Sequence, residues 1–120
     1  MPKLTSGARL SAPRARSRID AHMSSKPSVT QCASLGQIRS NIDRLDRDIV
    51  RLLAERERYV VQAARFKKTA SDVRAPHRVE EVVANVRRHA AQFGASADVI
   101  EKGYRVLVAG FTETELAAHK

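Results

Sequence analysis

Two cationic residues, Arg56 and Lys67, fall on one stripe of a predicted helix, with Val60 and Ala63 between them at steps of four, three and four. Positions three and four apart share a helix face, so both charges are expected to point the same way, with room between them. A guanidinium drawn toward an interior needs an anionic partner. The pattern therefore favours a site for an anionic ligand. The alternative is that Arg56 pairs with a glutamate and Lys67 extends to the surface.

A carboxyl group follows the same logic near the C-terminus. The stripe Tyr104, Val108 and Phe111 continues by four residues to Glu115, which is expected to face the same core or cavity. Desolvation disfavours an ionised carboxyl there unless nearby cations stabilise it. A glutamate donates a hydrogen bond only when protonated. The alternative is a frayed helix end with Glu115 in water.

The element that positions Arg56 and Lys67 is a long first helix. It is predicted from Leu35, without proline, to a region near residues 69–72. Its apolar seam alternates at three and four residues, which is typical of helices packed on helices. At ~1.5 Å per residue such a helix is ~50 Å long, more than a small core requires, so we expect a partner chain. The seam residues are Leu35, Ile38, Ile42, Leu45, Ile49, Leu52, Tyr59, Ala63 and Phe66, and Arg56 falls on the seam position between Leu52 and Tyr59.

Two further helices complete an all-α prediction. We expect a break over residues 71–74 and then a helix from Pro76 to about Gln92, because proline suits a first turn and Gly94 suits a C-terminal cap. Ser96 is the expected N-cap of the third helix, which runs to about Ala118.

Length and charge indicate one domain preceded by a tail. The chain has 120 residues, no tryptophan and a formal charge of +9. Residues 1–34 account for +5 and are predicted to be a disordered basic tail, a targeting presequence, or a stretch upstream of a true start at Met23. The domain is expected over residues 35–120. Because the lone cysteine, Cys32, cannot form an intramolecular disulfide and no long apolar run is present, we expect a cytoplasmic protein.

Four segments carry a family resemblance. Ile38–Asp46 (IRSNIDRLD) and Leu52–Arg56 (LLAER) resemble the first helix of the helical chorismate mutases. Ala64–Lys67 (ARFK) and Ala75–Val79 (APHRV) are similar to the branch of this family that contains the isochorismate pyruvate lyases of salicylate and siderophore synthesis. The resemblance covers residues 35–116.

The resemblance implies a chorismate mutase type II fold, an intertwined homodimer of three-helix chains in which each site draws on both chains. It implies that Arg39 from one subunit, with Arg56 and Lys67 from the other, holds the two carboxylates and ether oxygen of the substrate. Arg39 and Arg56 are 17 positions apart, ~25 Å along a helix, which is too far to clasp one small ligand from the same chain. Glu115 matches a position where relatives carry Gln or Glu on the ether oxygen.

Arg78 is a second candidate for a carboxylate contact, or else a surface residue beside Glu81. The acidic residues that open the second helix of many bacterial mutases are absent here, although Arg78 is retained.

The activity that the resemblance implies is rearrangement of chorismate to prephenate, with Lys67 and Glu115 as catalytic residues. The alternative is isochorismate pyruvate lyase activity, which yields salicylate and pyruvate. Either would belong to the shikimate pathway, in aromatic amino acid or salicylate biosynthesis. No metal, cofactor, nucleic acid or membrane partner is expected. A third hypothesis, a non-catalytic basic helical module, predicts binding that requires the tail and weakens steeply with salt.

Overall fold

Ser34 begins the first long helix, α2 (Leu35–Ala63), in the computed structural model, which describes residues 26–119. The Ser34 hydroxyl accepts a hydrogen bond from the Gln37 backbone N–H at 3.2 Å. The Gln37 side chain in turn accepts one from the Ala33 backbone N–H at 2.7 Å. The bond to the Ser34 hydroxyl satisfies a donor that a helix start leaves unpaired, which fixes the start of α2 at Leu35.

The end of α2 differs from the prediction. The helix stops at Ala63 and tightens into a 3₁₀ turn, η1 (Ala64–Phe66), whereas the periodicity predicted helix to residues 69–72. Lys67 then adopts an extended conformation with φ −104° and ψ 137°. The chain leaves the helix because Thr69 caps a separate helix, and one residue cannot serve as both helix interior and N-cap.

That separate helix is α3 (Ala70–Arg74), which occupies the segment predicted to be a break. Thr69 and Asp72 form a capping box in which each side chain accepts from the other's backbone N–H, at 3.1 and 3.2 Å. The prediction of a break over residues 71–74 was therefore wrong. The reversal of direction comes instead on either side of α3.

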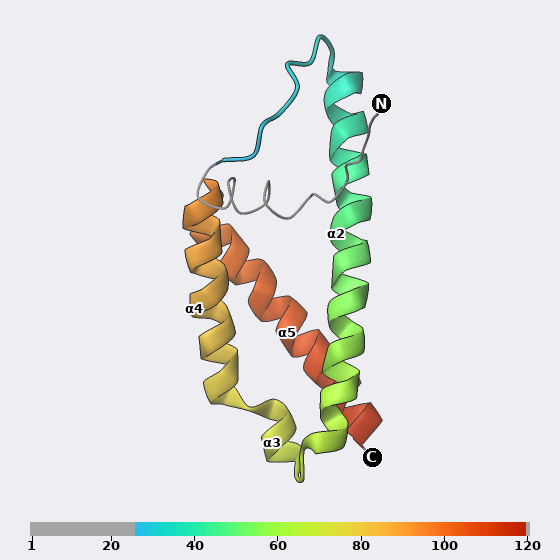
Figure 1. The fold of residues 1–120 in the computed structure, drawn as a ribbon, viewed down its shortest axis with the longest axis vertical. Coiled ribbons are helices and arrows are strands. Elements are labelled where there is room, and N and C mark those ends of the chain that lie inside the picture. The colour runs from blue at the N-terminus through green and yellow to red at the C-terminus, as the bar shows by residue number, and fades with distance from the viewer. Residues whose placement is uncertain (1–25, 120) are drawn as a thin grey trace, which may run out of the picture.

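The remaining two helices are α4 (Pro76–Phe93) and α5 (Ala97–His119), each within one residue of its predicted end. Gly94 takes the left-handed conformation, with φ 78°, that ends α4. The Ser96 hydroxyl accepts from the Val99 N–H at 3.3 Å and so caps α5. The prediction of an all-helical chain with three long helices is confirmed (Figure 1).

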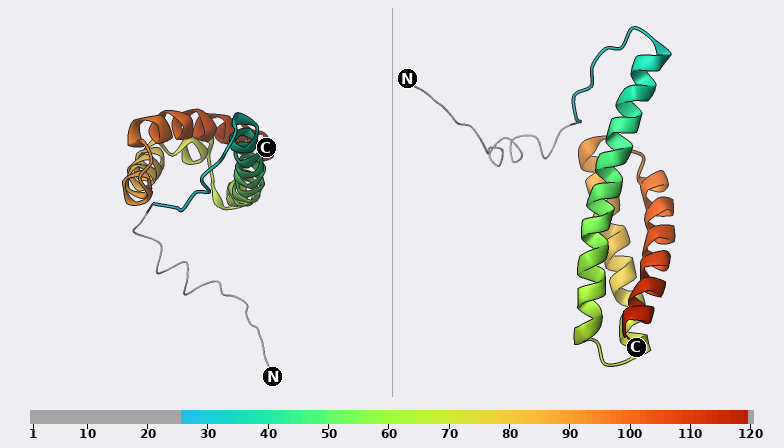
Figure 2. Two further views of the ribbon diagram at one scale, coloured as in Figure 1. Left: turned by 90° about the horizontal axis from the view of Figure 1, so that it is seen from above. Right: turned by 90° about the vertical axis from the view of Figure 1, so that its right-hand side faces the viewer.

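α5 is the central element of the arrangement. It packs along α4 and crosses to the C-terminal part of α2, so that α4, α5 and α2 form three sides of an open trough (Figure 2). The buried apolar residues of the described chain are few and small, namely Ala64, Val73, Val83 and Ala90. Within α2 no residue is buried. A single chain therefore covers little of its own apolar surface.

The apolar seam of α2 is left open to solvent. Six large aliphatic side chains spaced along the helix are each between 44% and 57% exposed: Leu35, Ile38, Ile42, Leu45, Ile49 and Leu52. Soluble proteins rarely leave so long a stripe uncovered, and such stripes mark interaction surfaces.

The predicted disordered tail, residues 1–34, lies mostly outside the described residues. Residues 26–34 form a non-helical segment leading to Ser34 (Figure 1). Over the described range 26–119, no helix has the length and apolar content that crossing a membrane requires.

Ion pairs join α4 to α5 on the outside of the trough. The Arg105 guanidinium donates two hydrogen bonds to Glu80, at 2.9 and 3.0 Å, and one to Glu101, at 2.7 Å. Arg87 bonds Asp98 and Glu101 at 3.0 and 2.8 Å. The hydrogen bonds from Arg105 hold the pKa of both Glu80 and Glu101 below the usual range of a glutamate. The network fixes the relative position of the two helices.

Replacing Arg105 with Gln should lower the Tm at pH 7, because both glutamates lose their main partner. A carboxyl whose pKa is depressed in the folded state stabilises the fold above the unfolded pKa and ceases to do so as the pH falls through the folded one. The difference from the native chain should therefore narrow below about pH 4. Thermal unfolding followed by circular dichroism measures this. Arg88→Gln is the control, since Arg88 bonds only the Asn85 side chain; an equal loss in both variants would contradict the account.

Candidate functional site

A cavity of about 310 Å³ opens between the C-terminal half of α2, the α3–α4 corner and α5. Its size is at the lower end of the range for small-molecule sites. Three separate parts of the chain contribute to its wall, so its shape depends on the crossing of α5 over α2. The lining residues are Arg56, Tyr59, Val60, Ala63, Lys67, Val73, Arg74, Ala75, Arg78, Val79, Val82, Val108, Phe111, Thr112 and Glu115.

Arg56 enters the cavity from α2 and is held by aromatic rings. Its guanidinium carbon lies 5.7 Å from the centre of the Tyr104 ring and 5.8 Å from that of Phe111, both on α5. Cation–π contacts of this kind hold a cation without neutralising it. No carboxylate of residues 26–119 lies within ion-pair distance of Arg56. The alternative in which Arg56 pairs with a glutamate is thus not observed, and its charge is free for a ligand.

Lys67 and Glu115 meet across the floor of the cavity. The Lys67 Nζ lies 2.8 Å from Glu115 Oε2, and the two side chains are 28% and 6% exposed. The contact is a close ion pair without good hydrogen-bond direction, and buried Oε2 has no hydrogen-bond partner among the described residues. Glu115 therefore does not lie in water at a frayed helix end. Its carboxyl group is buried beside one cation, with an acceptor left over for a ligand or a proton.

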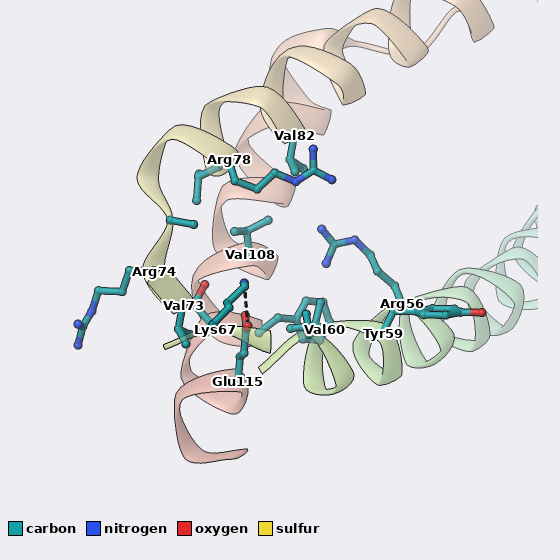
Figure 3. Close-up of a pocket in the computed structure, with 15 residues that line it drawn as sticks. Arg56, Tyr59, Val60, Lys67, Val73, Arg74, Arg78, Val82, Val108 and Glu115 are labelled. Atoms are coloured by element: carbon teal, nitrogen blue, oxygen red, sulfur yellow. Dashed lines mark ion pairs between the residues drawn. The ribbon is translucent and has the colours of Figure 1, made fainter. Parts of the chain in front are cut away.

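Arg78 and Arg74 stand on either side of the left-handed residue Ala75, which has φ 38° and ψ 64°. Figure 3 shows the Arg78 side chain extending over the cavity toward the guanidinium of Arg56, while Arg74 points away. Arg78 also bonds Glu81 at 3.3 Å and is 63% exposed, so both readings of it from sequence apply. A left-handed alanine costs roughly 1–2 kcal/mol. The strained residue lies at the corner between α3 and α4, directly before the helical turn that orients Arg78.

The cavity has an excess of positive charge. Arg56, Lys67 and Arg78 are directed into it, and Glu115 is its one carboxylate within the described range (Figure 3). Ionised Glu115 balances at most one of the three charges. A small dianion would bind both Arg56 and Arg78, whereas a neutral or cationic ligand would leave Arg56 without a counter-charge and Arg78 with only the exposed Glu81. The arrangement is therefore suited to a dicarboxylate.

Arg39 does not join this group. It lies in the second turn of α2, exposed, and the cavity lining contains no residue before Arg56. The separation of 17 positions between Arg39 and Arg56 corresponds to ~25 Å of helix. Of the five predicted site residues, one chain thus brings together Arg56, Lys67, Arg78 and Glu115, and Arg39 could reach a cavity of this kind only in another copy of the chain.

Arg74 and Thr112 are among the contributors to the cavity wall that sequence reasoning did not place there. Arg74 was placed in a break, although the Thr69–Asp72 capping box in the sequence indicates a helix there. Thr112 precedes Glu115 by three residues and so shares its helix face, which is a signal that the spacing contained.

The fold and the site place the chain among small all-α proteins with a cation-lined cavity at the crossing of their helices. Comparison with known proteins makes the class specific, since the family model described as chorismate mutase type II matches residues 38–116. The chain belongs to this family. It is also 40% identical over 70 residues to the isochorismate pyruvate lyase of Pseudomonas aeruginosa, an alignment that covers 58% of this chain and 69% of the relative.

Proposed function

We propose that the protein is a chorismate mutase that rearranges chorismate to prephenate, with isochorismate pyruvate lyase activity as the second candidate. The observation that carries the proposal is the cavity in which Arg56, Lys67 and Arg78 outnumber the single carboxylate of Glu115. Chorismate and isochorismate are small dicarboxylates with an ether oxygen, so they match both the charge and the volume of the cavity. Membership of the chorismate mutase type II family supports the same assignment.

The rearrangement is a unimolecular pericyclic shift, and the residues need only hold the substrate and stabilise charge. Arg56 and Arg78 would bind carboxylates and hold the enolpyruvyl group over the ring. Lys67, at the floor of the cavity, would donate to the ether oxygen as its bond to the ring carbon breaks and negative charge develops. A preorganised donor of this kind lowers a barrier by roughly 3 kcal/mol.

Glu115 would complete the group at the ether oxygen in its protonated form. When it is ionised, it accepts rather than donates, and it competes with the substrate for the Lys67 ammonium 2.8 Å away. Protonation removes both effects at once, because the neutral carboxyl donates a hydrogen bond and releases Lys67.

The site would be completed by Arg39 of the partner subunit in a homodimer. The exposed aliphatic face of α2 supplies the surface for pairing. An antiparallel partner helix would place its N-terminal turns beside the Arg56 end of α2, which brings a second copy of Arg39 within range of the cavity.

The lyase alternative uses the same cations on isochorismate, with transfer of a ring hydrogen to the departing enolpyruvyl group. The 40% identical relative, an isochorismate pyruvate lyase, supports this alternative. The protein should be incubated with chorismate and with isochorismate, and the products identified as prephenate or as fluorescent salicylate. Turnover of neither substrate would refute both assignments.

Lys67→Ala should lower kcat at least a hundredfold on the preferred substrate, since one preorganised donor is worth about 3 kcal/mol. The neighbouring exposed Lys68 gives the matched control, and Lys68→Ala should keep near-normal kcat. Circular dichroism should show unchanged helix content in both. Near-normal turnover by Lys67→Ala would remove Lys67 from the mechanism.

Glu115→Gln should keep or raise kcat, because glutamine donates a hydrogen bond to the ether oxygen and releases the Lys67 ammonium from its ion pair. Glu115→Leu, which removes the donor, should lower kcat while circular dichroism shows unchanged helix content. A large loss of kcat in Glu115→Gln, or equal losses in both variants, would show that a donor at this position has no part in the reaction.

Ile49→Glu should produce monomers at micromolar concentration with loss of turnover, because it places a charge in the middle of the exposed face of α2. Val106→Glu on α5 is the control; Val106 is 73% exposed and should tolerate the change. Sedimentation velocity gives the oligomeric state of each. A native chain that sediments as a monomer and is active would disprove the shared site.

A further inference from the structure

Lys67 is bound to α5 through its backbone as well as its side chain. His119 Nε2 lies 2.7 Å from the Lys67 carbonyl oxygen, and the two residues are 52 positions apart in the chain. A carbonyl can only accept, so Nε2 carries the hydrogen and donates, either as the neutral Nε2–H tautomer or as the imidazolium. Glu115 and His119 are four residues apart and so share one face of α5. That face thus holds both ends of Lys67.

The backbone at Lys67 has little other support. Lys67 lies in the extended gap between η1 and α3, outside any helix. Its own N–H reaches the Ala64 carbonyl at 3.4 Å, which is a long bond. The next two N–H groups, of Lys68 and Thr69, bond the Asp72 side chain and belong to the cap of α3. In the described chain His119 is therefore the one group that ties this carbonyl to the helix carrying Glu115.

We propose that His119 is a positioning residue, which fixes the Lys67 backbone so that its ammonium is presented to the ether oxygen of the substrate. The proposal rests on the function proposed above, since it concerns the same site. His119 is not among the residues that line the cavity, so it acts only through Lys67. A displacement of about 1 Å in a reacting group can cost up to about a hundredfold in rate. Loss of the bond would thus act on kcat much more than on KM.

Two variants separate the donor from the ring. His119→Phe keeps a ring at this position and removes the donor, and should lower kcat roughly tenfold or more with little change in KM. His119→Gln retains an N–H donor of similar reach and should recover most of that loss. His89→Phe, an exposed histidine on α4 outside the cavity, is the control and should match the native protein. Native turnover by His119→Phe, or equal losses in both His119 variants, would overturn the proposal.

A double-mutant cycle distinguishes positioning from general support of the fold. If His119 acts through Lys67, adding His119→Phe to Lys67→Ala should cause no further loss of kcat. A further loss equal to that in the native background would assign His119 a merely structural role and overturn the proposal.

A test without turnover keeps this inference separate from the function. The ¹⁵N spectrum of His119 should show a hydrogen-bonded Nε2–H, and His119→Phe should shift the ε-methylene resonance of Lys67 while leaving that of Lys68 in place. Unshifted Lys67 resonances would overturn the proposal. Should the native protein convert neither chorismate nor isochorismate, the proposed function fails, and these resonances still decide whether His119 positions Lys67.

Discussion

Uncompensated positive charge in a partly enclosed space is the constraint on which the molecule depends. Arg56 is held by the rings of Tyr104 and Phe111 and has no carboxylate partner among residues 26–119, and Arg78 extends toward it from α4. Lys67 forms an ion pair with one buried carboxyl group, that of Glu115. Cations brought together in this way repel one another in the free protein. Binding of an anion removes this repulsion, so the arrangement favours an anionic ligand. The chain tolerates this because α5 anchors Arg56 and Lys67 separately and Glu81 of α4 pairs with Arg78.

α5 is the helix that holds Arg56 and Lys67 in place. α5 supplies the rings that hold Arg56, the carboxyl group that faces Lys67 and the imidazole that holds the Lys67 backbone. Its position against α4 is fixed by the ion pairs of Arg87 on α4 with Asp98 and Glu101, and by that of Arg105 with Glu80 on α4. α2 contributes Arg56 at one end and an open aliphatic face along its length. Arg56 and the open aliphatic face thus belong to one helix.

The helices could be predicted from the sequence wherever apolar periodicity and capping residues determine their limits. Heptad spacing gave the start of α2, and Pro76, Gly94 and Ser96 gave the limits of α4 and α5 within one residue. The placement of Lys67 opposite Glu115 was foreseen only as a shared direction. The apolar periodicity predicted α2 to be longer than it is, because a local capping box at Thr69 outweighs a continuing apolar pattern. The partners of Arg56 and the contact from His119 could not be foreseen, since both depend on how two distant helices cross.

The most direct test of a cation site shared between two copies is subunit mixing. Arg39→Ala and Arg56→Ala are each expected to be inactive as homodimers. After unfolding and refolding together, a statistical mixture should recover about a quarter of native activity, because half of the dimers are mixed and each of these has one intact site. No recovery above the separate variants, or full activity of Arg39→Ala alone, would contradict the account.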